Sequence, residues 1–175
     1  MENFEDKVKS MKASEIVQAM IDSLKEPVYK IDMDTFGMTF EGVCYGCAAT
    51  NTIAKISGEF VEFNCDKNSY VQWSDKLKVG SDFLWNFEMA IDYLRSGDLL
   101  YYAKYAEKAG FGTLPLAIWE SQSGPDYSRL PVLTSVSYLK NLHHYEALVE
   151  ALKLAEAEEA KEAEETEQEG VSNET

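Results

Sequence analysis

The stretch "SDFLWNFEMAIDYLRSGDLLYYAKYAEKAG", residues 81–110, predicts two helices joined by a tight corner. Apolar side chains in its first half recur at helical spacing and form one stripe, made of Phe83, Phe87, Ile91 and Leu94. Gly97 is a natural end for this helix, Asp98 is placed to cap the next one, and Gly110 ends the second. We therefore expect a helical hairpin here.

Two more helices are expected before this hairpin. Residues 4–25 carry apolar side chains at helical spacing, with Ser14 as a suitable N-cap, and Pro27 follows their end. Residues 45–56 predict a shorter helix that Gly58 terminates.

The C-terminal part of the chain predicts one long helix that begins at Thr134 or Ser135. Its apolar stripe runs out after Ala155, although alanine and glutamate continue to favour a helix. We therefore expect one globular domain over residues 1–155, followed by an acidic tail over residues 156–175 that is helical or disordered.

Short strands are indicated where the period of the sequence changes to two. Residues 29–33 and 36–40 alternate in this way, which suggests a hairpin turning near residues 34–37, and residues 60–65 suit a third strand. The fold class expected is α+β and predominantly helical, with four to five helices and a small antiparallel sheet of two to three short strands. The proline-containing segment 111–131 is expected to be a surface loop.

The charge of the chain disfavours direct binding to nucleic acid. The formal net charge is −15, of which −7 falls in residues 151–175 and −8 in residues 1–150. The only arginines are Arg95 and Arg129, and no cluster of basic residues exists to neutralise phosphates. An acidic surface suits instead a partner protein with a basic surface.

The sequence predicts a cytoplasmic protein that is not inserted in a membrane. No apolar run approaches the length of a membrane span, and the first residues lack the apolar region of a signal peptide. Three cysteines are then expected to be reduced, and no motif calls for a cofactor.

Cys44 and Cys47 form a CxxC pair that has two possible interpretations. At the start of a helix, a thiol pKa falls, so this pair, with Cys65 as a resolving thiol, could serve a redox enzyme or sensor. However, a helix and strands precede the pair, without the βαβ unit of thioredoxin-like proteins. Buried structural thiols are the preferred interpretation.

A zinc-stabilised module is another alternative. Cys44, Cys47 and Cys65, together with His143, would make a Cys3His ligand set. Structural zinc sites usually combine two closely spaced pairs, whereas Cys65 stands alone, so no metal is expected.

Aromatic side chains near predicted loops are the best candidates for a contact surface. Four of them are assigned to an interface, Tyr70, Trp73, Trp119 and Tyr127, because tyrosine and tryptophan anchor protein interfaces. No catalytic constellation is found. The sequence therefore predicts a non-enzymatic, acidic protein-binding protein, acting as an inhibitor that occupies a basic, nucleic-acid-binding surface of its partner, as phage-type counter-defence proteins do.

Overall fold

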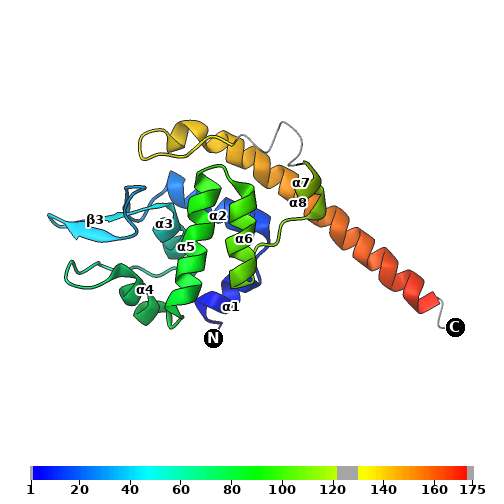
Figure 1. Cartoon of the computed structure of the whole chain (residues 1–175), viewed down its shortest axis with the longest axis horizontal. Helices are drawn as coiled ribbons and strands as arrows, with labels where there is room; N and C mark the ends of the chain where they lie inside the picture. The colour runs from blue at the N-terminus through cyan, green and yellow to red at the C-terminus, as the bar shows by residue number, and fades with distance from the viewer. Residues whose placement is uncertain (1, 122–129, 173–175) are drawn as a thin grey trace.

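The computed structural model describes residues 2–121 and 130–172, with the side chains of residues 119–121 excepted. Eight helices and three short strands lie in these residues (Figure 1). The helices are α1 Phe4–Lys9, α2 Ala13–Lys25, α3 Ala48–Ser57, α4 Ser69–Leu77, α5 Ser81–Arg95, α6 Leu99–Ala109, α7 Leu116–Ser121 and α8 Tyr138–Ser172. The strands are β1 Lys30–Ile31, β2 Met38–Phe40 and β3 Val43–Gly46. The α+β, predominantly helical class is confirmed.

The predicted helical hairpin is confirmed as α5 and α6. The Asp98 carboxylate accepts a hydrogen bond from the backbone N–H of Tyr101 at 3.1 Å and so caps α6. Gly97 turns the chain with φ at +81°, and a Cβ at this position would lie 2.2 Å from the carbonyl oxygen of Leu130. The corner therefore requires glycine both for its conformation and for the close approach of a neighbouring segment.

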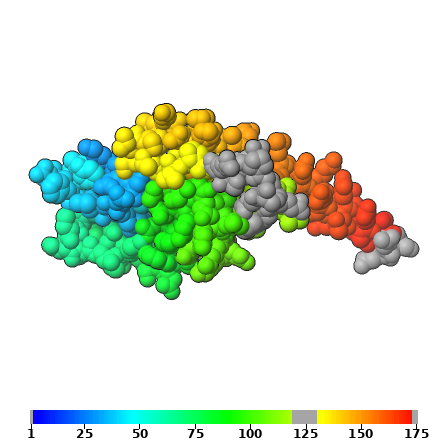
Figure 2. Space-filling model, turned by 45° about the horizontal axis from the view of Figure 1, so that its top comes forward, coloured from blue at the N-terminus to red at the C-terminus, as the bar shows by residue number. Residues whose placement is uncertain are grey.

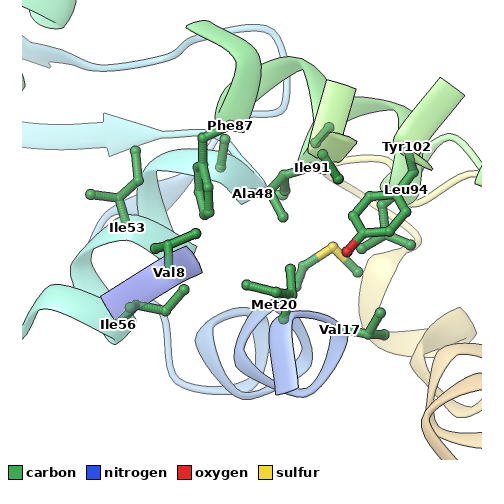
Figure 3. Close-up of a cluster of buried hydrophobic side chains, with 14 of the residues drawn as sticks. Val8, Val17, Met20, Ala48, Ile53, Ile56, Phe87, Ile91, Leu94 and Tyr102 are labelled. Carbon is green, nitrogen blue, oxygen red and sulfur yellow. The ribbon is translucent and has the colours of Figure 1, made fainter. Parts of the chain in front are cut away.

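The hydrophobic core lies between α2, α3, α5 and α6, with α1 and α8 packed around them. Side chains from α1, α2, α3, α5 and α6 meet there (Figure 3). Figure 3 labels Val8, Val17, Met20, Ala48, Ile53, Ile56, Phe87, Ile91, Leu94 and Tyr102. The predicted α5 stripe is buried in this core, as hydrophobic periodicity implies.

The single helix predicted for residues 4–25 is instead two helices. The helix is interrupted between α1 and α2. There the Glu15 carboxylate accepts a hydrogen bond from the backbone N–H of Lys12 at 2.7 Å. Ser14 is therefore not the N-cap. It lies in the first turn of α2, almost fully buried. The break lets Phe4 of α1 pack edge-on against Phe83 and Phe87 of α5.

The sheet is mixed rather than antiparallel, in the order β1-β3-β2. β1 pairs parallel with β3, and β2 pairs antiparallel with β3. The hairpin turns at Glu41 and Gly42, whose φ angles of 49° and 77° fit a type I′ turn. The prediction of a turn near residues 34–37 is thus wrong, and so is the helical start at Tyr45, which belongs to β3.

The strand predicted over residues 60–65 is not formed. Its backbone is held by a side chain instead, because the Tyr29 hydroxyl donates to the Val61 carbonyl and accepts from the Val61 N–H, both at 2.8 Å. Tyr29 thus replaces a neighbouring strand at this point. The prediction of four to five helices also fell short, since α1 is separate from α2, and α4 and α7 had not been expected.

The last helix, α8, is 35 residues long and continues well past Ala155. It begins at Tyr138, after a turn over residues 135–137. The Thr134 hydroxyl accepts from the N–H of Ser137 at 3.2 Å, which is the contact of an N-cap side chain. Residues 157–172 are exposed. After the contact of Glu159 with the start of α7 they project from the body, at the end opposite the β2–β3 hairpin (Figures 1 and 2). We call these residues the arm. Among the described helices, none is long and apolar enough to cross a membrane.

Candidate protein-binding surface

The sheet turns its more apolar face toward solvent. In the β2–β3 register, Met38 pairs with Tyr45 and Phe40 with Val43, so these four side chains share one face. Met38 is 37% exposed, Phe40 56% and Val43 40%, while Tyr45 is half-buried. We call these four residues the hairpin face.

The opposite face of the same hairpin packs on the body. Thr39 and Cys44 are paired there and half-buried, and the Cys44 sulfur lies 3.3 Å from the Thr39 hydroxyl. Ile31 of β1 also contacts the core from this side. A half-buried sheet normally directs its apolar residues inward. The hairpin reverses this arrangement, and an apolar face left in water is typical of a contact surface.

A second group of aromatic side chains begins beside β2. Phe36 and Tyr70 are stacked, with ring centroids 4.3 Å apart, and Trp85 of α5 lies 6.1 Å from Tyr70. Trp85 is 49% exposed, although it is one of the largest apolar side chains. We call these three residues the aromatic ladder. Rigid aromatic rings that are partly exposed are the side chains that dominate binding energy at protein interfaces.

A cavity connects the hairpin face to the aromatic ladder. Its volume is about 400 Å³, and both Met38 and Tyr70 line it. Asn64, Cys65 and Lys67 contribute polar atoms to its wall. One residue of each apolar group therefore lines the same concave site, which has room for a side chain.

Charged groups lie close to this surface. The ammonium group of Lys30 sits 5.5 Å from the centre of the Tyr45 ring, at the border of the hairpin face. Glu88 lies one turn after Trp85 on α5, and its Oε2 atom is buried without a hydrogen-bond partner in the described residues. Burial, followed by the charge of Asp92, raises the pKa of the Glu88 carboxyl to about 7.

Two of the four predicted interface residues can be compared with the structure. Tyr70 lies in the aromatic ladder. Trp73 is fully buried against Tyr29 and Phe63, so it belongs to the core and is not accessible to a partner. The prediction for Trp73 missed that α4 is a helix, which turns this side chain inward. The Trp119 side chain and Tyr127 lie outside the described residues.

Sequence reasoning missed the hairpin face and Trp85. A signal existed for the hairpin face, since "MTF" and "VCY" both alternate around the glycine-containing turn at Glu41 and Gly42. Trp85 had no such signal, because it lies outside the apolar stripe of α5 and its aromatic neighbour Tyr70 comes from another element.

The structure separates the two cysteines of the CxxC pair into different environments. Cys44 is half-buried in β3, whereas Cys47 is buried at the N-cap of α3. Burial raises the pKa of the Cys47 thiol to about 11, and this effect outweighs the hydrogen bonds from Thr50. Cys65 is exposed and donates to the Thr39 carbonyl at 2.9 Å. This environment of Cys47 favours the thiol over the nucleophilic thiolate.

The alternative ligand set for zinc is not brought together. In residues 2–121 and 130–172, no three His, Cys, Asp or Glu side chains are grouped so that they could hold a metal ion. His143 lies on α8, where its Nδ1 atom is 3.1 Å from the Lys140 carbonyl oxygen.

When compared with known proteins, the chain matches no family model, no curated protein and no solved structure.

Proposed function

We propose that this protein acts by binding another protein, and that the partner docks on the hairpin face and the aromatic ladder. The observation that supports this proposal is the reversed hairpin, which turns the half-buried Thr39 and Cys44 toward the body and leaves Phe40 and Val43 exposed. Exposing these apolar side chains opposes folding and solubility, and burial under a partner would remove that cost.

The partner we propose has a basic surface. The chain carries a net charge of −15, and its arm holds seven glutamates against one lysine. A second copy of the chain would bring the same negative charge, which opposes self-association. Complementary charge favours instead a partner rich in lysine and arginine.

In its most specific form, the proposal is that the partner binds nucleic acid and that this protein inhibits it. The arm is about 24 Å long, and its carboxylates lie along an exposed helix. A row of negative groups of this kind could occupy sites that otherwise hold phosphates. Such inhibition requires binding alone and no catalytic residue.

Affinity capture tests this proposal with two matched variants. The immobilised full chain would be exposed to a lysate of its source cell, and bound proteins identified by mass spectrometry. Phe40→Ser removes an apolar side chain from the hairpin face, whereas Leu100→Ser removes one of equal exposure, 57% against 56%, from α6. We expect the Leu100→Ser variant to capture the partner and the Phe40→Ser variant to lose it.

The same experiment tests the chemistry of the partner. Raising the salt from about 50 mM to about 300 mM should release most of it, because salt screens the attraction between exposed charges. Excess duplex DNA or RNA should release it as well, since it would compete for the basic surface. If the Phe40→Ser variant still captured the partner, the proposed docking site would be wrong. If neither salt nor nucleic acid released the partner, the proposal that the protein inhibits a nucleic-acid-binding partner would be wrong.

A further inference from the structure

We propose that the docking surface is sensitive to pH, because loss of the proton from Glu88 releases Trp85 from the aromatic ladder and weakens binding of the partner. This inference concerns the regulation of that surface and rests on the proposed function. It starts from one unsatisfied atom, since Oε2 of Glu88 is buried and has no hydrogen-bond partner among the described residues. Such an environment tolerates the neutral form of a carboxyl group far better than the charged form.

The carboxyl group of Glu88 adjoins the aromatic ladder at Trp85. Side chains of a helix lean toward its N-terminus, so the Glu88 side chain is directed toward the turn of α5 that carries Trp85. Residues three apart on a helix are also neighbours on its surface. Tyr70 of α4 lies on the other side of Trp85, with ring centroids 6.1 Å apart, and Phe36 stacks on Tyr70. Glu88 is therefore next to one end of the ladder.

The other end of the ladder leads back to Glu88 through α3. The Phe36 carbonyl accepts a hydrogen bond from the Thr50 hydroxyl, and the Thr50 Oγ1 atom lies 3.7 Å from the Cys47 sulfur. Burial is the main cause of the raised pKa of the Cys47 thiol, and the charge of Glu88 adds to it, so these two groups are close enough to interact. Cys47 and Thr50 are buried and form the inner wall of this ring of contacts.

No positive charge compensates Glu88 when it ionises. Its pKa is raised to about 7 by burial and then by the charge of Asp92, one turn later on α5, and no cation of the described residues contributes. Asp92 is itself paired with Arg95 at 2.8 Å. The titratable groups that face Glu88 from other elements are the Cys47 thiol of α3, which burial keeps protonated with a pKa of about 11, and the Tyr70 phenol of α4. Ionisation therefore places an uncompensated charge beside Trp85.

Trp85 is the side chain that moves when this charge forms. The carboxylate is stabilised if water reaches Oε2, which requires one of the surrounding side chains to give way. Trp85 is 49% exposed, so it can turn into solvent without opening the core, whereas Cys47 and Thr50 cannot. Its departure from Tyr70 breaks the ladder. The partner then binds the protonated form, and its affinity falls as the pH rises through about 7.

NMR of the full chain, without any partner, tests the switch. The indole N–H signal of Trp85, identified by its absence from a Trp85→Phe variant, is expected to shift between about pH 5.5 and about pH 8.5 with a midpoint near 7. Glu88→Gln keeps the shape of the side chain but cannot ionise, so it should hold the signal at its low-pH position. Glu107→Gln, which removes an exposed carboxylate from α6, should retain the titration. A Trp85 signal that does not move, or that titrates equally in Glu88→Gln, would overturn the switch.

Affinity capture at pH 6 and pH 8 tests its effect on binding. The wild-type chain and Glu88→Gln should capture equal amounts of partner at pH 6, and the wild type up to about tenfold less at pH 8, where only about one molecule in eleven keeps the proton. Both chains meet the same partner at each pH, so ionisation of the partner does not change their ratio. Equal capture at pH 8 would overturn the regulation and leave the docking site intact. Retention of the partner by Phe40→Ser would instead overturn the docking site and leave the titration of Trp85 unchanged.

Discussion

Glu156 of α8 caps the start of α2 through Ser14. One carboxylate oxygen accepts from the backbone N–H of Ser14 at 3.0 Å, and the other accepts from its hydroxyl at 2.6 Å. Glu159, nearly one turn later, accepts from the N–H of Leu116 at 2.7 Å at the start of α7. These two acidic residues of α8 thus fix the starts of two other helices, and negative charge at their N-termini complements the helix dipole.

We predict that Glu156→Ala destabilises the fold by about 2 kcal/mol, because it leaves the buried Ser14 hydroxyl and N–H without their charged acceptor. Glu156→Gln should reduce stability by about half as much, because the amide oxygen of glutamine can still accept one of the two hydrogen bonds. Urea denaturation followed by circular dichroism would measure both. Glu158→Ala, at an exposed position two residues later, should change stability by less than about 0.5 kcal/mol. Equal effects of Glu156→Ala and Glu158→Ala would show that the cap does not stabilise α2.

Glu88 is predicted to make stability depend on pH near neutrality. Its pKa is about 7 in the folded protein, above its ordinary value of 4.5, because burial disfavours the charge. The folded state therefore binds this proton more tightly than the unfolded state, and the resulting stabilisation is complete below about pH 4.5 and lost as the pH rises through 7. Melting temperatures measured between pH 5 and pH 8 should show this loss.

Glu88→Gln should remove that part of the pH dependence and raise stability at pH 8 by about 1 kcal/mol, a value discounted for the partial exposure of the group. Glu107→Gln is the matched control, because it removes one exposed carboxylate from α6. If both variants changed the pH profile equally, the effect would come from net charge and not from burial of Glu88.

The helical hairpin could be predicted from the sequence because its signals are local. The α5 stripe, the Asp98 cap and the glycines all act within a few residues of one another. The Ser14–Glu156 contact joins residues 142 positions apart, so no local pattern reveals it. The reversed orientation of the β2–β3 hairpin could not be predicted for another reason. Alternation places Phe40 and Val43 on one face, but it does not say which face meets the core.

The thiols are predicted to react in the order of their exposure. Cys65 is exposed and should be alkylated first, Cys44 more slowly, and Cys47 only when the protein unfolds. A raised pKa and burial both protect Cys47 at pH 7. Iodoacetamide labelling followed by mass spectrometry of peptides gives the three rates. Rapid labelling of Cys47 below pH 7 would contradict this order and favour a redox function for the CxxC pair.

Gly97→Ala is predicted to destabilise the protein by about 2 kcal/mol or more, because the added methyl group meets the Leu130 carbonyl and φ is positive. Gly80→Ala, at the N-cap of α5, places a methyl group in open space at an ordinary φ of −70°. It should destabilise the protein by no more than about 1 kcal/mol, the cost of a poorer N-cap residue. Chemical denaturation of the two variants compares them directly, and similar losses would show that the corner tolerates a side chain.

Site-specific photo-crosslinking in the source cell tests the hairpin face most directly. A photoreactive phenylalanine analogue would be placed at position 40, and in a separate sample at position 100, which is equally exposed on α6. The account predicts a crosslink from position 40 to one predominant basic protein and none from position 100. Equal crosslinking from both positions, or none from position 40, would contradict a partner docked on the hairpin face.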